Sequence, residues 1–352
     1  MKYYIGLDAH SRTCTGVVVN EKGEQKFRQT FPTSEGNLIG FLKGIAGEKV
    51  LTFEEGNLAQ WLYVTLREHV DELLVCNPVF IAKRRGAKTD YLDALHLAQE
   101  LRTGHLKPVY HDESKWIELR ILVNNYLGLI HEIVRVKNRL KAVFRSEAID
   151  TNYNKFYEDK SRTQNLSTET ARFVSSQLFD QIERLEKFKL EYKLCFKRNV
   201  KKYRPIKNLT SIPGIDLIRA NVITAIICMP HRFKNKHQFW GYCMLVRHIQ
   251  ISGGRIYGNK RFHGRAELRN VFLGAAESAL RTDSKLREYY DCMRAKGRSH
   301  KQVKISLGRK IAALCLSLLK NAESYREDFE QANLKRGEIR RELYEGLVSK
   351  TS

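Results

Sequence analysis

Proline, long apolar runs and paired cysteine motifs are scarce or missing in this sequence of 352 residues. Only six prolines occur, so long disordered linkers are not expected. No apolar run reaches the roughly 18 residues that a membrane span requires. The N-terminal residues MKYYIGLDAH lead into a strand instead of forming a signal peptide. We therefore expect a soluble, cytoplasmic protein.

The seven cysteines are odd in number, lie far apart and form no CxxC pair, which predicts reduced thiols in a cytosolic protein. One spacing could serve zinc, that of Cys228, His231, His237 and Cys243. These residues run across an expected helix end into a basic loop, and their pairs lack the usual spacing of zinc fingers. Buried cysteines and surface histidines are the favoured interpretation.

Acidic residues are too few to balance the basic ones. Lys and Arg number 62 against 39 Asp and Glu, which leaves a formal net charge of +23. This excess predicts a polyanionic partner, because each phosphate that Lys or Arg neutralises releases condensed counterions. Charge alone does not separate DNA from RNA. The length exceeds a typical domain of roughly 100 to 200 residues, so two or three folded units are expected.

Hydrophobic periodicity over residues 1–110 predicts three strands followed by alternating helices and strands. The expected strands are 2–7, 15–19, 25–31, 49–53 and 72–75, and the expected helices are 34–45, 58–69 and 89–102. The order β-β-β-α-β-α-β-α is that of the ribonuclease H-like fold. We therefore predict an α/β N-terminal domain of the ribonuclease H-like (RuvC-like) class.

Two long helices are expected next, at 114–149 and 166–199, with apolar residues at three-four spacing and a polar tip at 150–165. This pattern is typical of an antiparallel helical hairpin. The hairpin could pack within the chain with its charges in solvent, or it could be a protruding coiled coil that dimerises. The narrow apolar stripes favour the coiled coil.

The rest of the chain is expected to be mainly α-helical. The predicted domains are therefore a metal-dependent domain at 1–110, a coiled-coil hairpin at 111–203, a basic domain at 204–322 and a charged helical tail at 323–352. No internal repeat or low-complexity segment interrupts them.

Acidic side chains follow the ends of the expected strands in the first domain. Asp8 follows the first strand, Glu54 and Glu55 follow strand 49–53, and Asp90 and Asp93 share one face at the start of a helix. Such acids repel unless cations neutralise them, and two Mg²⁺ ions suit phosphoryl transfer. Taken singly, each acid is more often a cap or a surface group. Glu54 is the favoured ligand and Glu55 the reserve.

Four cations, Lys83, Arg84, Arg85 and Lys88, stand immediately before the acidic helix. They can form a solvated loop, but their place beside acids is better explained by phosphates lying between the two.

Residues 209–227 resemble a helix-hairpin-helix, in which two helices join at Pro213-Gly214-Ile215. Gly214 would let backbone amides approach a phosphate closely. The alternative is an ordinary helix turn capped by glycine.

Residues 232–269 carry nine Lys or Arg against one acid and are interleaved with aromatic residues, which suits a nucleic-acid surface. The cations Arg255, Lys260, Arg261 and Arg265 belong to it. Within it, Ser252 is expected on a flexible, Gly-rich, cationic loop where its hydroxyl could attack a phosphorus. A serine in such a place is, by itself, more often a turn residue.

The motifs YIGLDAH, LTFEEGNLAQWLY, GAKTDYLDALHLA, LTSIPGI, QFWGYCML, ISGGR and ELRNVFLGAA occur in this order. Together they resemble the bacterial insertion-sequence transposases of the IS-one-ten family, which also includes the Piv-type DNA invertases. The resemblance implies a RuvC-like domain with a DEDD metal site, a coiled-coil linker, and a transposase domain whose serine attacks DNA.

By this resemblance Ser252 is the nucleophile that forms a phosphoserine bond with a DNA 5′ end, while Asp8, Glu54, Asp90 and Asp93 hold Mg²⁺. A noncoding bridge RNA would pair with donor and target DNA and choose the sites. The chain departs from many relatives at Met244, where they have Gly, and at Arg265, where Asn is common.

We therefore expect an RNA-guided DNA transposase or site-specific recombinase that acts as a dimer or tetramer beside the bacterial nucleoid. The alternative enzyme is a RuvC-like structure-selective nuclease that uses metal-activated water. A non-catalytic nucleic-acid-binding protein explains the charge, but it would gain nothing from acids placed beside phosphate.

Overall fold

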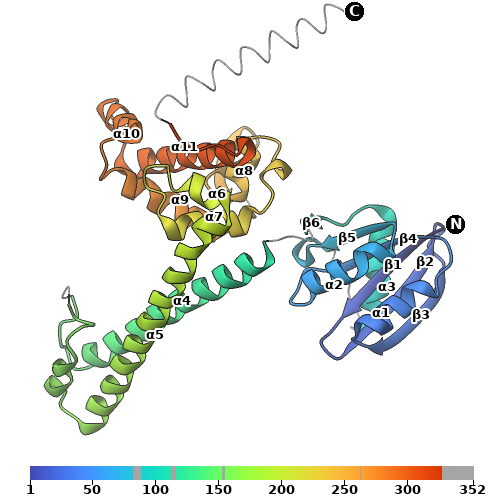
Figure 1. The fold of residues 1–352 in the computed structure, drawn as a ribbon, viewed down its shortest axis with the longest axis horizontal. Coiled ribbons are helices and arrows are strands. Elements are labelled where there is room, and N and C mark those ends of the chain that lie inside the picture. The colour runs from blue at the N-terminus through green and yellow to red at the C-terminus, as the bar shows by residue number, and fades with distance from the viewer. Residues whose placement is uncertain (82–88, 112–115, 153–154, 262, 327–352) are drawn as a thin grey trace, which may run out of the picture. The chain divides into compact units, whose positions relative to one another are not determined.

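The computed structural model describes residues 1–81, 89–111, 116–152, 155–261 and 263–326 (Figure 1). The chain forms two compact units, Met1–Ser114 and Lys115–Ser352. No helix among the described residues is long and apolar enough to cross a membrane.

A six-stranded sheet forms the centre of the first unit. Its strands are β1 (Lys2–Ala9), β2 (Thr13–Asn20), β3 (Gln25–Pro32), β4 (Glu48–Glu54), β5 (Glu72–Cys76) and β6 (Pro108–Val109), in the spatial order β3-β2-β1-β4-β5-β6. β1, β4 and β5 run parallel, whereas β2, β3 and β6 pair antiparallel to their neighbours. The predicted meander and the element order after it are therefore confirmed.

Helices cover both faces of this sheet. On one face, Ile5 and Leu7 of β1 belong to a core shared with α1 (Glu35–Lys43) and α2 (Ala59–Leu66). On the other, α3 (Asp90–Thr103) packs Ala94 and Ala98 against valines of β2. The short helices η1 (Arg67–His69) and η2 (Pro78–Phe80) flank β5. This arrangement is a mixed α/β unit of three layers.

Gly6 allows α3 to lie directly on β1. A Cβ at Gly6 would meet the Ala94 carbonyl oxygen at 2.1 Å and the Ala98 nitrogen at 2.6 Å, so no larger residue fits. α3 begins at Asp90 because the side chain of Thr89 accepts a hydrogen bond from the Leu92 amide. The close contact and the cap together fix where the first turn of α3 lies above the sheet.

Two long helices, α4 (Ile117–Arg145) and α5 (Glu169–Lys202), form an antiparallel hairpin in the second unit (Figure 1). Their apolar stripes pack on one another, as Ile133 and Leu140 do with Leu178 and Ile182. At the tip, Phe156 closes this core beside η3 (Lys160–Asn165). The predicted pair of helices is present, and its dimerisation stays a prediction.

Short helices make up the body of the second unit: α6 (Arg204–Leu209), α7 (Leu217–Ile227), η4 (Pro230–Arg232), α8 (Lys236–Tyr242), α9 (Ala266–Ala279), α10 (Lys285–Ala295) and α11 (His300–Asn321). Their core also includes Trp116 and Val123 of the α4 end and Phe196 of α5. The base of the hairpin and the helical body therefore share one core. Residues 327–352 of the predicted helical tail lie outside the described residues.

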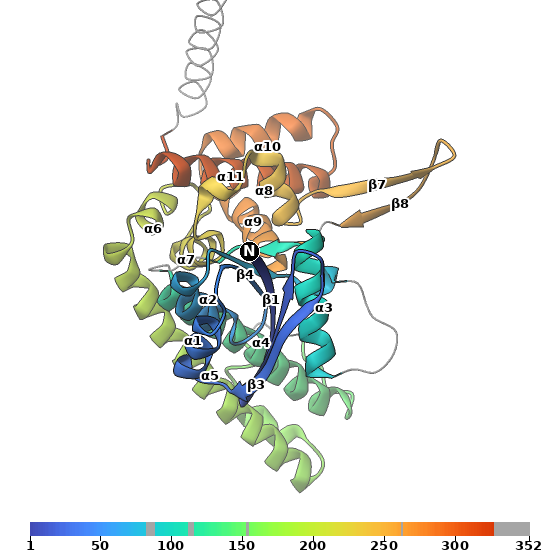
Figure 2. The same ribbon diagram turned by 90° about the vertical axis from the view of Figure 1, so that its right-hand side faces the viewer.

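A two-stranded ribbon of β7 (Arg247–Ser252) and β8 (Arg255–Arg261) extends from the helices of this unit (Figure 2). The sequence predicted helices and loops here, which is wrong for these residues. The run is rich in cations, and its described large apolar residues, Ile251 and Tyr257, are exposed, so its strands resemble a surface loop in sequence. Two adjacent glycines between short runs with Ile and Tyr are nevertheless a hairpin signal.

Candidate active site

Two carboxylates stand at neighbouring strand ends in the first unit. β1 and β4 are parallel and in register up to the pair Leu7 and Phe53, so Asp8 and Glu54 take the next position on each strand. Side chains alternate along a strand, so Asp8 points to the same face as Gly6, which is the face that α3 covers. By the same register Glu54 lies on that face.

The first turn of α3 adds two more acids, Asp90 and Asp93, which are three residues apart. Burial raises the pKa of the Asp8 carboxyl, His10 opposes this effect, and the charges of Asp90 and Asp93 raise that pKa further. These interactions bring Asp8, Asp90 and Asp93 into one electrostatic group. Carboxylates held so close to one another favour a bound cation.

A histidine completes this group. The Nε2 atom of His10 lies 3.2 Å from Asp8 Oδ2 and 3.8 Å from Asp90 Oδ1. One ligand atom from each of these three residues lies within 4.8 Å of the others, which is close enough to hold one metal ion. The sequence analysis missed His10, although its spacing of two from Asp8 on an extended segment is a usable signal.

Glu55 points elsewhere. Its carboxylate bonds to Nε2 of His111, whose Nδ1 lies 3.1 Å from Oε1 of Gln60 in α2. The His111 side chain is only 2% exposed. This buried imidazole engages Glu55, whereas Glu54 lies on the face that carries Asp8, and which of the two adjacent acids binds a metal stays a prediction. His111 was also missed, because nothing local in the sequence links it to Glu55.

Ser252 is the last residue of β7, and it is exposed. It pairs in register with Arg255, and the two residues between them, Gly253 and Gly254, have φ angles of 55° and 76°. Two positive φ angles in a two-residue connection are what a type I′ turn requires. The prediction of a flexible loop is therefore wrong: Ser252 and Arg255 are strand residues beside a tight turn.

The predicted nucleic-acid contacts fall into two sets. Arg255 is exposed beside the turn, and Arg265 precedes α9 with its Nε 3.4 Å from a Glu267 oxygen. Six further cations lie outside the described residues or have undescribed side chains: Lys83, Arg84, Arg85, Lys88, Lys260 and Arg261.

Gly214 has a packing reason for being glycine. Its φ is +87°, and a Cβ there would meet the Ala275 carbonyl oxygen of α9 at 2.3 Å. Its own carbonyl accepts a hydrogen bond of 2.9 Å from Arg219. The turn lies between α6 and α7, but α6 has only six residues and lies almost wholly before the predicted segment 209–227, so the helix-hairpin-helix stays a prediction. Phosphate contact by this turn stays a prediction.

The possible zinc group does not assemble. Within the part of the chain that the structure describes, Asp8, His10 and Asp90 form the only group of three or more such residues whose ligand atoms come together. Cys243 is buried, and burial raises the pKa of its thiol. The favoured interpretation of a buried cysteine is confirmed there.

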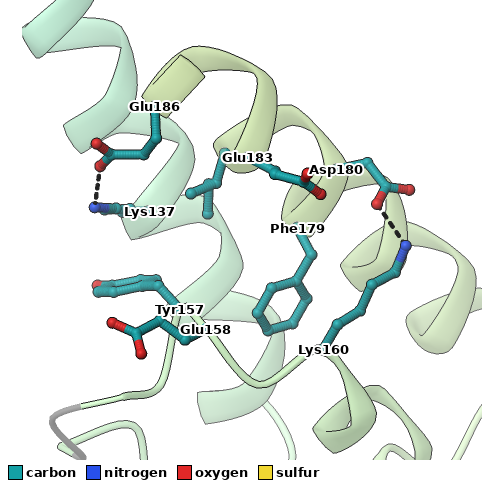
Figure 3. A pocket seen from close by; sticks show the side chains of 9 residues that line it. Lys137, Tyr157, Glu158, Lys160, Phe179, Asp180, Glu183 and Glu186 are labelled. Carbon is teal, nitrogen blue, oxygen red and sulfur yellow. Dashed lines mark hydrogen bonds and ion pairs between the residues drawn. The ribbon is translucent and has the colours of Figure 1, made fainter. Parts of the chain in front are cut away.

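A hollow of about 660 Å³ near the hairpin tip lies between α5 and residues 157–160 (Figure 3). Its charges are largely paired: Lys137 bonds to Glu186 at 2.8 Å and Lys160 to Asp180. The Lys137 ammonium also lies 4.9 Å from the centre of the Tyr157 ring. These pairs join α5 to α4 and to η3 at the hairpin tip.

Two family models match the chain. One, described as "Transposase" and named for DEDD transposases of IS110, covers residues 5–147. The other, "Transposase IS116/IS110/IS902 family", covers residues 206–291. The chain belongs to the IS110 (IS-one-ten) family of transposases. All four predicted acids lie in the first matched segment, and Ser252 lies in the second.

A curated relative of this IS110-family transposase is the "Insertion element IS110 uncharacterized 43.6 kDa protein" of Streptomyces coelicolor. The two are 26% identical over 118 residues, which is 33% of this chain. The matched part spans 29% of the length of that relative. The DEDD domain suggests dependence on a divalent metal, and the group of Asp8, His10 and Asp90 is of a kind that can hold one.

Met244 occupies a position at which the family resemblance leads us to expect Gly. Its φ is +52°, in the left-handed region that favours glycine. The Met244 amide bonds to the Gly241 carbonyl at 2.9 Å and the Leu245 amide to the Trp240 carbonyl at 2.9 Å, which ends α8. The backbone turn is therefore formed with Met in a conformation that costs roughly 1 kcal/mol.

Proposed function

We propose that this IS110-family transposase cleaves and rejoins DNA through Ser252, assisted by a site at which Asp8, Glu54, Asp90 and Asp93 hold two Mg²⁺ ions. The observation that carries the proposal is the convergence of Asp8 and Asp90 where β1 meets the start of α3. The strand order and the crossover helices also support the ribonuclease H-like fold that the sequence predicts.

The acids fit a hard divalent cation because their oxygens are the ligands that Mg²⁺ prefers. Asp8 lies at a strand end and Asp90 in a capped helix turn, so neither needs to move far to share a cation. Bound Mg²⁺ would polarise the phosphate and stabilise the leaving oxygen. Without a cation, burial and the neighbouring acids oppose the charge on Asp8.

Ser252 supplies the nucleophile in this proposal. Its Oγ loses a proton and forms a bond to phosphorus, while the bond from phosphorus to the DNA 3′ oxygen breaks and that oxygen gains a proton. The product is a 5′-phosphoserine adduct, which keeps the phosphodiester energy until a new 3′ hydroxyl displaces the serine. Arg255, the register partner of Ser252, would stabilise the developing negative charge.

Donor and target DNA are the proposed substrates, and a bridge RNA is the proposed guide. The net charge of +23 supports a polyanionic partner of either kind. The proposed assembly is a dimer or tetramer that uses the α4–α5 hairpin. RNA that co-purifies with the protein should include a segment able to pair with the donor and target sites, and random fragments alone would contradict guidance.

One observation favours a second candidate, a nuclease that uses metal-activated water. The group of Asp8, His10 and Asp90 is assembled within the first unit and needs no residue of the second. Such an enzyme would cut DNA without any protein adduct.

Denaturing gels of end-labelled DNA separate the two candidates. Wild type should give a protein–DNA adduct that survives denaturation, and Ser252→Ala should remove both adduct and recombination. Ser167→Ala is the control, since Ser167 is also an exposed serine of the second unit but lies outside the ribbon of β7 and β8. Cleavage that persists in Ser252→Ala, with no adduct in wild type, would assign the chemistry to water.

A further inference from the structure

We propose that His10 is a further ligand of the metal site and that its nitrogen makes the site prefer Mn²⁺ to Mg²⁺. This inference rests on the proposed function, because it takes Asp8 and Asp90 as ligands of the same ion. It adds a nitrogen donor to a site otherwise built from carboxylate oxygens.

The distances around His10 fit shared coordination. Neighbouring ligand atoms around an octahedral ion with bonds of about 2.1 Å lie about 3 Å apart. His10 Nε2 lies 3.2 Å from Asp8 Oδ2 and 3.8 Å from Asp90 Oδ1, so the imidazole nitrogen is near that spacing from both oxygens. All three ligand atoms lie within 4.8 Å of one another.

The backbone of His10 is held on both sides. Its amide donates to the Thr13 carbonyl at 2.9 Å, and its carbonyl accepts from the Thr33 hydroxyl at 2.6 Å. Asp8 lies two residues earlier, where β1 is paired with Thr15 of β2. The imidazole therefore projects from a fixed turn toward the carboxylates. Its side chain is 59% exposed, which leaves an ion a path from solvent.

A nitrogen ligand changes which ion the site prefers. Mg²⁺ binds oxygen ligands and dehydrates reluctantly, whereas imidazole suits transition metals. Mn²⁺ binds both carboxylate and imidazole ligands, so coordination by His10 should raise the affinity for Mn²⁺ more than the affinity for Mg²⁺. The expected effect of His10 is on the ratio of the two affinities.

Pulsed electron paramagnetic resonance of the full-length protein loaded with Mn²⁺ tests for the nitrogen directly. Wild type should show ¹⁴N modulation from a coordinated imidazole, and His10→Gln should lose it. His105→Gln is the matched control, because His105 is an exposed histidine of the same unit beside a single acid, Glu100. Mn²⁺ bound to wild type without ¹⁴N modulation would overturn the proposal.

Titration calorimetry with Mn²⁺ and Mg²⁺ gives the second readout. We expect wild type to bind Mn²⁺ at least about 10-fold more tightly than Mg²⁺ and His10→Gln to reduce that ratio to within about 3-fold. An unchanged ratio in His10→Gln would contradict the role of His10 while leaving the acids in place. If Asp8→Asn binds both metals as wild type does, the metal site of the proposed function fails instead.

Discussion

Asp8 lies next to the last residue of a strand in the middle of a six-stranded sheet, whereas Ser252 is the last residue of a strand in a two-stranded ribbon. Around Asp8, the sheet, α3 and the turn at His10 determine where each polar group lies. Around Ser252, the cross-strand pairing and the turn at Gly253 and Gly254 determine the backbone conformation, and residues 251 to 255 are exposed. The first region is organised by packing and the second by backbone pairing.

This difference indicates how the acids and the serine would each be positioned for their proposed roles. Acids that repel one another need a rigid frame, because they must stay together before a cation arrives. A serine on an exposed ribbon can reach a large polymer, and contacts with DNA can complete its surroundings. The two regions should therefore respond differently to substitutions that disturb packing and to those that disturb a turn.

The largest effect is expected from Gly6→Val. Its side chain would overlap the backbone of α3 at Ala94 and Ala98, so the helix must move or the unit must unfold. We expect a loss of about 3 kcal/mol or more in the free energy of unfolding, together with loss of metal binding.

Chemical denaturation and calorimetry measure both effects. Gly36→Ala in α1 is the control, since a Cβ there meets nothing within 4 Å. Metal affinity that survives in a folded Gly6→Val would show that the approach of α3 does not organise the acids.

Gly254→Val is expected to change overall stability less than Gly6→Val does, but to reduce adduct formation clearly. No atom lies within 4 Å of a Cβ at this position, but the φ of +76° is strained for valine. The melting temperature should change little, because the ribbon carries little of the buried core, whereas adduct formation should fall at least about 10-fold. Retained adduct formation would mean that the turn does not position Ser252.

Asp8→Asn should separate stability from function. Burial disfavours the charged form of Asp8, so the neutral amide should raise the melting temperature of the metal-free protein by a few degrees. The stabilisation that Mg²⁺ gives to wild type should disappear in this variant. Thermal unfolding with and without Mg²⁺ makes the measurement, and a lower melting temperature in the metal-free variant would contradict the electrostatic account.

The smallest effect is expected from Met244→Gly. Glycine adopts the φ of +52° without strain but loses more backbone entropy on folding. We therefore expect the free energy of unfolding to rise by up to about 1 kcal/mol. Denaturant titration is the measurement, with Met229→Gly as the control because Met229 has a φ of −108°. A loss of stability in Met244→Gly would mean that the Met side chain contributes more than the turn costs.

Much of the first unit could be predicted from the sequence because β1, β2 and β4 have apolar, buried centres and because α1 and α3 begin after the capping residues Ser34 and Thr89. Asp8, Asp90 and Asp93 follow directly from those boundaries. The sequence favoured Glu54 over Glu55, but the contact between Glu55 and His111 could not be predicted, since His111 is far away in the sequence and buried against α2. His10 was missed because the ligands of this site were sought only among carboxylates.

The second unit was harder to predict because its proposed nucleophile, Ser252, is exposed in a two-stranded ribbon. The two long helices of the hairpin have regular apolar spacing and were predicted within a few residues. The described large apolar side chains of β7 and β8, Ile251 and Tyr257, are exposed, so the hydrophobic pattern that identifies strands was weak there. Gly214 was interpreted as a phosphate contact, although its closest neighbours are backbone atoms of α9.

Mass spectrometry of the protein–DNA adduct tests the central claim most directly. Trypsin cleaves after Arg247 and Arg255 and so releases the peptide HIQISGGR, in which Ser252 is the one hydroxyl residue. After nuclease treatment of trapped reactions, the account predicts a nucleotide 5′-phosphate on that serine. A nucleotide on another peptide, or strand exchange with no modified peptide at all, would contradict it.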